Sequence, residues 1–597
     1  MIISLTPGLL YILGAAINAL LPKSLHRLWV ILLPMGVLVQ LATLSANSGV
    51  SVSGISGTLQ LLRVDPLSMT FGWVFVVASL AGFLYGLSVA KKREYTAALV
   101  YIGSALSVIF AGDLLTLYIF WELMAISSVF LVLFSNTGTS RAAGLRYIIV
   151  HIVGGLVLLA GIIMHAHATG SLLFDAISIK NTASWLMLIG MLVNAAAFPF
   201  SSWLSDAYPE STIMGGVILS AFTTKTAVYT LLRAFPGWDT LIWVGVVMAI
   251  FGVLYAVFEN NIRRILAFSI INQGGFMVCA VGIGSPLAIA GSAAHAFCCI
   301  IYTALLWMAA GAVIHQTGKS NCTELGGLYR YMPFTTIFAI IGALAIAAAP
   351  FASGFTSKML ILKAAKMEHL FWPWLGLELA SVGVVFHAGL RFILDVFFGK
   401  DCGLKVNEAP RPMLLGMGIC ALITVYIGLF PGLFYSLLPF SDLVMASIPH
   451  TFYGIYIKYA KNVVTQWELL LMAVVAFFMI RKTIQPSSRI LRDVDWFYRR
   501  LLRYVVAFVI GFIDFMYNLI NRLAMGGVKR LAGFFQTSIP TLLYLMNAPI
   551  IRSSNLKVNK FKLMEGYDKQ VREQAFPFTV LGAMVFIVFI ALYVLIN

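Results

Sequence analysis

Ala195-Ala-Ala-Phe-Pro-Phe-Ser-Ser-Trp-Leu-Ser205 and Ala347-Ala-Ala-Pro-Phe-Ala-Ser-Gly-Phe-Thr-Ser357 repeat one pattern in two parts of the chain. Each segment interrupts a long apolar stretch with Pro-Phe and small polar residues. Matching interrupted helices in two halves of a membrane protein are typical of an inverted repeat, with a transport path that passes through the breaks. Irregular backbone survives at membrane depth only where protein or water satisfies it. We therefore expect both breaks to be functional, and a pair of ordinary proline kinks is the alternative.

The composition indicates a membrane protein. Of the 597 residues, 60% are apolar and 11% are charged, and the mean hydropathy is +0.94. Soluble domains carry roughly 25% charged residues, so this chain could not keep a soluble surface. A helix needs about 20 residues to cross a bilayer, and the sequence supplies such stretches repeatedly, for example 464–480 and 576–596. We predict an all-α, polytopic protein of the bacterial or archaeal-type inner (plasma) membrane, with about 16 transmembrane helices.

The distribution of basic residues predicts the topology. The formal charge is +17, but Lys and Arg lie in short loops between apolar runs, which does not favour a nucleic-acid partner. Loops after odd-numbered spans, such as the one with Lys91, Lys92 and Arg93, are richer in Lys and Arg than loops after even-numbered spans. The positive-inside rule then places both termini on the non-cytoplasmic side.

No cofactor or metal site is expected. The six cysteines form no Cys-x-x-Cys pair, and no haem or iron–sulfur ligand set is visible. No nucleophile motif indicates a catalytic site of the chain's own. Any enzymatic role would therefore come from membership of a larger complex.

The segment from 493 to 540 carries basic and aromatic residues towards both its ends, with Arg499 and Arg500 near the first and Lys529 and Arg530 near the second. We predict a long amphipathic helix that lies along the cytoplasmic side before the last span, and another span is the alternative. The predicted parts of the chain are 1–95 (N-terminal helices), 96–235 and 236–400 (two repeats, each with a broken helix), 401–485 (C-terminal helices), 486–560 (lateral helix region) and 561–597 (final anchor).

Ionisable residues inside predicted spans are the candidate functional residues, because burying a charge in a membrane is costly. Glu122 lies well inside its span, where a carboxyl must find a cation or take up a proton. We expect Lys225 or Arg146 to hold it. Lys225 and Lys358 can exchange protons when buried, which Arg cannot do. With His295, these residues form the predicted proton path: Glu122, Lys225, His295 and Lys358.

Further polar residues are auxiliary candidates. His151, His315 and His387 are expected at membrane depth, although a single histidine there more often joins two helices by a hydrogen bond. Arg391 and Asp395 lie on one helical face and, with Glu378, could form an internal ladder of ion pairs that is structural rather than transporting.

Five consecutive motifs resemble those of the antiporter-like subunits that Mrp cation/proton antiporters share with complex I and related respiratory complexes. The motifs are 113–122, 203–209, 224–229, 263–269 and 354–358. Segment 387–391 is most similar to the version in the D-type Mrp subunit, and the region after residue 435 resembles the lateral-helix extension of the largest such subunit of complex I. The resemblance implies a hydrated polar axis in which Glu122, Lys225 and Lys358 match family positions.

Several positions depart from the family pattern. Asn194 stands where the family has a lysine that pairs with the glutamate, Ser201 where it often has His, and Thr303 where many members have Lys. Arg391 replaces a frequent Lys. Because neither Asn nor Thr carries a net proton, water would have to bridge these gaps.

Two functions remain open on the sequence alone. The first is a subunit that translocates protons, with Na⁺ as a second candidate ion, inside a multisubunit membrane complex. The second is a structural, non-conducting subunit with the same fold, whose lateral helix clamps its neighbours. In both cases the implied partners are lipids and other integral membrane subunits. The complex could be an Mrp antiporter, complex I-like, hydrogenase-like or a carbon-uptake system.

Overall fold

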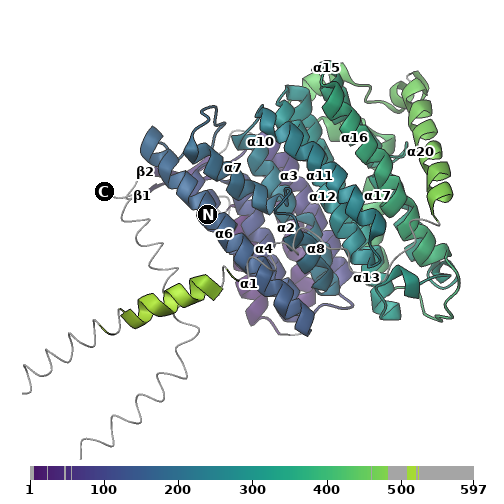
Figure 1. Cartoon of the computed structure of the whole chain (residues 1–597), viewed down its shortest axis with the longest axis horizontal. Helices are drawn as coiled ribbons and strands as arrows, with labels where there is room; N and C mark the ends of the chain where they lie inside the picture. The colour runs from purple at the N-terminus through teal and green to yellow at the C-terminus, as the bar shows by residue number, and fades with distance from the viewer. Residues whose placement is uncertain are drawn as a thin grey trace, which may run out of the picture. The chain divides into compact units, whose positions relative to one another are not determined.

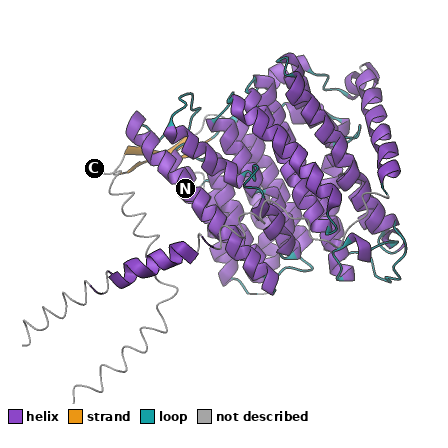
Figure 2. Ribbon diagram, in the orientation of Figure 1, coloured by secondary structure: helices purple, strands orange, loops and turns teal. Residues whose placement is uncertain are grey.

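The computed structural model describes residues 6–22, 25–45, 49–54, 57–458, 460–481, 504, 507–519 and 522. The chain divides into two compact units, Met1–Leu491 and Arg492–Asn597. Helices make up nearly all of the first unit (Figures 1 and 2). In the second unit, the described helix is Ala507–Leu519.

The elements of the first unit, in chain order, are α1 (Pro7–Leu20), α2 (His26–Thr43), β1 (Gly49–Gly54), β2 (Gly57–Arg63), α3 (Pro66–Gly86), α4 (Lys92–Phe110), α5 (Leu114–Leu133), α6 (Gly138–Thr169), α7 (Thr182–Asn194), α8 (Ser202–Ala207), η2 (Tyr208–Glu210), α9 (Ile213–Ala221), α10 (Thr223–Ala234), α11 (Asp239–Phe258), α12 (Ile262–Ile283), α13 (Pro286–Thr317), η3 (Cys322–Glu324), η4 (Leu328–Arg330), α14 (Pro333–Ile346), α15 (Ser353–Met367), α16 (Phe371–Val384), η5 (Val385–Arg391), η6 (Leu394–Phe398), α17 (Arg411–Leu429), α18 (Pro431–Tyr435), α19 (Ser441–Ser447), η7 (Tyr453–Lys458) and α20 (Ala460–Ile480).

The helices confirm a multi-pass α-helical membrane fold. Within the described residues, ten helices are long and apolar enough to cross a membrane. α12 and α13 are apolar all round and almost entirely buried, as expected of helices at the centre of a bundle. The predicted number of about 16 spans is not confirmed, and its last member, near residue 586, lies outside the described residues.

A small β-hairpin modifies the all-α prediction. β1 and β2 pair antiparallel between α2 and α3, and Figure 2 shows them at one end of the helical bundle. Gln60 of β2 donates its backbone N–H to Asp113 Oδ2 at 2.9 Å and accepts from the Gly112 amide. The hairpin therefore joins the loop before α5 and does not hang free.

The fold contains a repeat that starts at α5 and again at α12. Asp113 and Asn261 cap these helices. Asp113 forms an isolated β-bridge to Leu173, and Asn261 forms one to Asn321, so the two bridges join residues with the same separation in the chain. In both repeats, a 32-residue helix precedes that bridge: α6 in the first and α13 in the second. Between α5 and α12, the chain crosses the bundle through α6, α7–α8, α9–α10 and α11. After this even number of crossings, α12 starts at the end of the bundle opposite to the start of α5, so the second copy runs in the opposite direction. This is the inverted repeat that the sequence predicts.

The two predicted breaks have the same geometry. α7 ends at Asn194 and α14 at Ile346, with Ala195 and Ala347 as C-caps. The next residues, Ala196 and Ala348, take left-handed φ angles of 57° and 56°. In each case, the amide of the following alanine donates to the carbonyl five residues earlier, at 3.0 Å after α7 and 2.8 Å after α14. These are Schellman-type helix ends, which usually place glycine at the left-handed position.

A third break was not predicted. The span expected around residue 222 is divided at Phe222 into α9 and α10. From the sequence alone we expect Lys225 to lie in the middle of one continuous helix; this is wrong, because Lys225 lies in the first turn of α10. Its ammonium group is placed beside the end of the preceding helix.

The predicted lateral helix lies almost wholly outside the described residues. Only residues 504, 507–519 and 522 of the segment 493–540 are described, and they include the 13-residue apolar helix Ala507–Leu519. The prediction of a helix that lies along the membrane stays a prediction.

We predict opposite effects for glycine at two positions near the second break. Ala348→Gly should be neutral or stabilising, because glycine removes the cost of a left-handed alanine. Ala345→Gly, in the regular part of α14, should lower stability by about 1 kcal/mol. Thermal unfolding of the purified protein measures both. Equal destabilisation by the two changes would contradict the assigned helix end.

Candidate functional site

Both candidate lysines donate to carbonyls at the ends of broken helices. Lys225 Nζ donates to Ser220 O of α9 at 2.8 Å, and Lys358 Nζ donates to Ile346 O of α14 at 3.0 Å. Both side chains are buried. The last carbonyls of a helix lack intrahelical partners and carry partial negative charge, so an ammonium group is favoured there.

The remaining neighbours of Lys358 also suit a cation. Its Nζ lies 3.4 Å from Ser381 Oγ and 4.7 Å from the centre of the Phe276 ring. An ammonium group over an aromatic face gains from the negative face of the ring. Glu378 of α16 interacts with Lys358 electrostatically. Lys358 is thus held by a helix end, a hydroxyl and a ring.

His295 is hydrogen-bonded at both ring nitrogens. Nδ1 lies 3.0 Å from Ser357 Oγ, and Nε2 lies 3.1 Å from Gln273 Oε1, which also accepts from the Tyr302 hydroxyl at 3.0 Å. Because an amide oxygen only accepts, Nε2 must carry the hydrogen, and Nδ1 of the neutral ring accepts from Ser357. The tautomer follows from this network.

Ser357 gives His295 a way to gain a proton. Its hydroxyl is also within bonding distance of Ser353 O and Gly354 O, at 3.2 and 3.3 Å. If the hydroxyl turns to either carbonyl, Nδ1 is free to take a proton and donate it to Ser357 Oγ. Ser357 precedes Lys358 in the chain, so the histidine and the lysine are joined by one short segment of α15.

Three of the four predicted path residues lie together. His295 interacts electrostatically with both Lys225 and Lys358, which approach it from α10 and α15. Residues from both repeats therefore lie close to His295 of the buried helix α13.

Glu122 lies apart from this group. Its Oε1 is buried, has no hydrogen-bond partner among the described residues, and lies so close to Gly155 of α6 that a Cβ there would collide with it. Lys225 bonds to Ser220, and Arg146 forms a two-bond pair with Asp206, at 2.6 and 2.9 Å. The prediction that Lys225 or Arg146 holds Glu122 is therefore wrong, because each cation has a closer acceptor.

The positions that depart from the family pattern are buried. Both side-chain amide atoms of Asn194 and the hydroxyl of Ser201 lack hydrogen-bond partners among the described residues, as does Nε2 of His151. Thr303 Oγ1 contacts Cys299 Sγ at 3.4 Å. Buried polar groups without a protein partner are typically satisfied by internal water.

The auxiliary histidines have different surroundings. His151 stacks on Tyr147 with ring centres 4.0 Å apart, and its Nδ1 lies 2.9 Å from Tyr147 O. His387 Nε2 lies 2.9 Å from Ser269 Oγ, so it joins η5 to α12. His315 is exposed in the last turn of α13, and the expectation of membrane depth is wrong for this residue.

The expected ladder in the 371–398 span is formed in part. Arg391 Nε lies 3.6 Å from Asp395 Oδ2, and Arg481 Nη2 lies 3.2 Å from Asp395 Oδ1. Arg391 also donates to the backbone oxygen of Val257. Glu378 belongs to no described ion pair, so Arg481 completes the ladder in its place.

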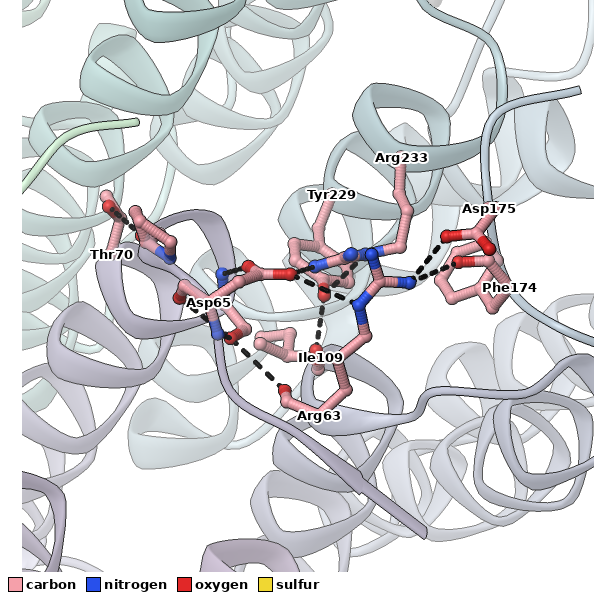
Figure 3. A network of polar contacts seen from close by, with 10 residues as sticks. Arg63, Asp65, Thr70, Ile109, Phe174, Asp175, Tyr229 and Arg233 are labelled. Carbon is pink, nitrogen blue, oxygen red and sulfur yellow. Dashed lines mark hydrogen bonds and ion pairs between the residues drawn. The ribbon is translucent and has the colours of Figure 1, made fainter. Parts of the chain in front are cut away.

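A second polar network closes one end of α10 (Figure 3). Arg233 Nη2 bonds to Asp65 Oδ2 at 2.7 Å and Arg233 Nε to the Tyr229 hydroxyl at 2.9 Å. Arg63 bridges Asp65 and Asp175, at 3.5 and 2.7 Å. These charged groups line a cavity of about 600 Å³. Lys225, Tyr229 and Arg233 recur every fourth residue, so one face of α10 runs from the buried lysine to this cavity.

Asp65 stays ionised in this network. Burial alone would raise the pKa of its carboxyl, but Arg233, the Ser68 amide and Arg63 together lower the pKa below its usual value. Asp65 also caps α3 through the Ser68 amide at 2.9 Å. One carboxylate therefore holds the start of α3 and the end of α10.

Sequence reasoning missed the residues that bind the candidates. Gln273, Ser357 and Gly155 are uncharged, and only their contacts with His295 and Glu122 reveal them. The sequence does contain a signal for Arg233: it follows Lys225 by two helical turns, so both residues lie on the same face of a helix.

Residues 111–384 match the family model described as NADH:quinone oxidoreductase/Mrp antiporter, TM. A probable A/B subunit of a K⁺/H⁺ antiporter from Rhizobium meliloti (strain 1021) is 30% identical over 407 residues, which are 62% of this chain and 40% of the relative. The A1 subunit of a Na⁺/H⁺ antiporter from Staphylococcus aureus (strain JH9) is 29% identical over 470 residues, 69% of this chain and 59% of the relative. The chain thus spans about half the length of these curated relatives.

Two solved structures share the fold. One is the Mrp complex from Dietzia sp. DQ12-45-1b (TM-score 0.65, 19% identity, 78% of this chain and 99% of that chain). The other is the archaeal membrane-bound sulfane sulfur reductase (TM-score 0.64, 24% identity, 72% of this chain and 94% of that chain). The curated relatives carry the names of A-type or A/B-type subunits, so the similarity to the D-type at 387–391 does not extend to the subunit type.

We predict that Gly155→Ala displaces the Glu122 carboxyl, because the added Cβ would occupy the space of Oε1. Under the function proposed below, ion transport in membrane vesicles should fall while the protein level is unchanged. Adding Glu122→Asp shortens the side chain and should restore part of the transport lost. If the double variant is no better than Gly155→Ala alone, the contact does not matter for transport.

We predict an acid-sensitive contribution from Asp65. Its folded-state pKa lies below the unfolded value of about 3.9, so its stabilisation is full above that value and is lost as pH falls through the folded pKa. Asp65→Asn should cost roughly 2 kcal/mol at neutral pH, because Arg233 loses a charged hydrogen-bond acceptor. The cost should vanish at low pH.

Thermal unfolding of both proteins between about pH 2 and about pH 7 measures this difference, because the series must pass below the folded-state pKa of Asp65. Asp442→Asn, at an exposed position of α19, is the control and should have no effect at any pH. A cost of Asp65→Asn that is independent of pH would contradict the electrostatic role.

Proposed function

We propose that this chain is a proton-translocating, antiporter-like subunit of a multisubunit membrane complex, and the match of residues 111–384 to the NADH:quinone oxidoreductase/Mrp antiporter family model supports this. The observation that carries the proposal is the arrangement of Lys225, His295 and Lys358. Three groups that can each bind and release a proton interact at the centre of the bundle, and the two lysines sit on helix breaks.

The chemistry of the three groups suits proton transfer. A buried lysine can lose its proton. An imidazole can take up a proton at one ring nitrogen and release another from the second nitrogen. In our proposal, internal water carries a proton from Lys358 to the Ser357 hydroxyl, which passes a proton to His295, and Lys225 exchanges with the same histidine. Each lysine is drawn back to its protonated form by the helix end that it caps.

Glu122 would exchange protons with this group through water. The polar atoms of Glu122, Asn194 and Ser201 that lack protein partners support a hydrated path in the first repeat. Protons are favoured over Na⁺ because the grouped residues are nitrogen bases, whereas hard cations prefer several oxygen ligands. Na⁺ stays the second candidate ion, since the relatives include subunits of Na⁺/H⁺ antiporters.

A structural, non-conducting subunit is the second candidate. Asn194 supports it, because this residue cannot supply the cation that Glu122 would need, and Arg146 is taken by Asp206. In this case, the region after Arg481 would clamp neighbouring subunits. The proposed partners are other membrane subunits in both cases, as in the solved complexes that share the fold.

The orientation is also a proposal. The end of the bundle with Lys91, Arg141 and Arg264 is proposed to be cytoplasmic, with both termini on the other side. The network of Asp65 and Arg233 then faces the non-cytoplasmic side.

We predict that Lys358→Arg stops transport while the complex still assembles. Arginine keeps the charge and can still donate to Ile346 O, but it does not release a proton in proteins. Lys358→Ala should also stop transport, and Lys319→Ala, at an exposed position, should have no effect. The measurements are pH-gradient formation in membrane vesicles and assembly on native gels.

Normal transport by Lys358→Arg would rule out proton exchange at this residue. Normal transport by the Lys225→Ala, Lys358→Ala double variant would end the conduction proposal. Loss of assembly on deletion of the region after Arg481, with transport unaffected by the lysine changes, would favour the structural subunit.

A further inference from the structure

A large cavity lies at the end of the bundle opposite the Asp65 network, between α1, α2, α4 and α5. Its volume is about 960 Å³, which is in the range of pockets that enclose small ligands. One part of its wall is basic and consists of His26, Arg27, Lys91, Lys92 and Arg93. No residue of the proposed proton path lines it.

The other part of the wall is apolar. It is made by Val100, Leu123, Ile126, Phe130 and Phe134. Ile126 and Phe130 are 41% and 42% exposed, so this part opens sideways, at the level of the membrane-spanning part of α5. The cavity therefore joins a basic end to an apolar side opening.

The basic groups converge on the start of α4. Lys91 is the N-cap, and Lys92 and Arg93 occupy the first turn. Cations are unfavourable at a helix N-terminus, because the backbone dipole already places positive charge there. Three in a row create a strongly positive site that an anion would relieve.

Among the described residues, no Asp or Glu forms an ion pair with Arg27, Lys91, Lys92 or Arg93. No Asp or Glu is among the described residues that line the cavity. Glu94, the nearest acid in sequence, accepts from the Lys91 backbone amide at 3.1 Å. Lys92 Nζ donates to the last carbonyls of α1, at Ala19 and Leu21, and the Arg93 guanidinium lies 4.7 Å from the centre of the Phe134 ring.

We propose that this cavity binds an anionic phospholipid. Its phosphate would lie among Arg27, Lys91 and Arg93 at the start of α4, and an acyl chain would follow the apolar wall along α5. Basic cavities between transmembrane helices at the cytoplasmic surface suit such headgroups, and the sideways opening admits the chain. The site would fasten α1 and α2 to α4 and α5.

The test compares lipids added to the delipidated full-length protein in detergent. Phosphatidylglycerol should raise the unfolding temperature and phosphatidylcholine should not, because only the first carries a net negative charge. Inorganic phosphate and glycerol phosphate probe the headgroup chemistry alone. Stabilisation by either of these to the same extent as by phosphatidylglycerol would overturn the lipid assignment in favour of a free phosphate.

The variants separate charge from the apolar wall. Each basic residue near an anionic surface strengthens lipid binding roughly fivefold, so Arg27→Gln, Lys91→Gln and Arg93→Gln together should weaken phosphatidylglycerol binding by about a hundredfold. The matched control changes three basic residues outside the cavity, Arg141, Lys319 and Arg330, to Gln. Equal loss in the control would overturn the proposal.

A cavity-filling change keeps every charge. Ala97→Phe should displace the acyl chain and reduce the phosphatidylglycerol that co-purifies, as measured by mass spectrometry. It should have no effect on binding if the cavity is not the site. A photoreactive side chain at Ala97 should crosslink to lipid in native membranes, and crosslinking to another protein instead would overturn the proposal.

Discussion

Helices that stop inside the membrane leave backbone carbonyls without intrahelical partners, and no solvent is available there to satisfy them. In this chain, Lys225 and Lys358 meet that demand at the ends of α9 and α14. The bonds that allow the breaks to exist are the same bonds that hold two titratable groups at membrane depth. Stability of the fold and the proposed proton chemistry therefore share their atoms, and a change in either lysine affects both.

The two repeats use this plan differently. In the second, Gln273, His295 and Ser357 form a continuous set of hydrogen bonds through α12, α13 and α15. In the first, the polar groups near Glu122 have few protein partners. A symmetric backbone thus supports a closely bonded polar group on one side and, in our proposal, a hydrated one on the other.

The ends of the bundle are distinct as well. One carries the Asp65 and Arg233 network with both signs of charge, and the other carries the basic cavity at the start of α4. Acid and base in contact hold α3 and α10 together directly. At the second end, the described residues that line the cavity include five basic side chains and no Asp or Glu. An anion from outside the protein would balance this charge, so we place the proposed lipid site there.

The sequence by itself determined the membrane class, most of the helices, the repeat and two of the three breaks, because apolar length and Pro-Phe interruptions are local properties. It also identified Lys225, His295 and Lys358, since charged or titratable residues stand out in an apolar run. Only the tertiary structure decided which groups bond: Arg146 pairs with Asp206, Glu122 lies against Gly155, and His295 bonds to Ser357 and Gln273. The physical reason is that hydrogen bonds and ion pairs depend on distances of a few ångströms between residues far apart in the chain, and those distances arise only when the helices pack.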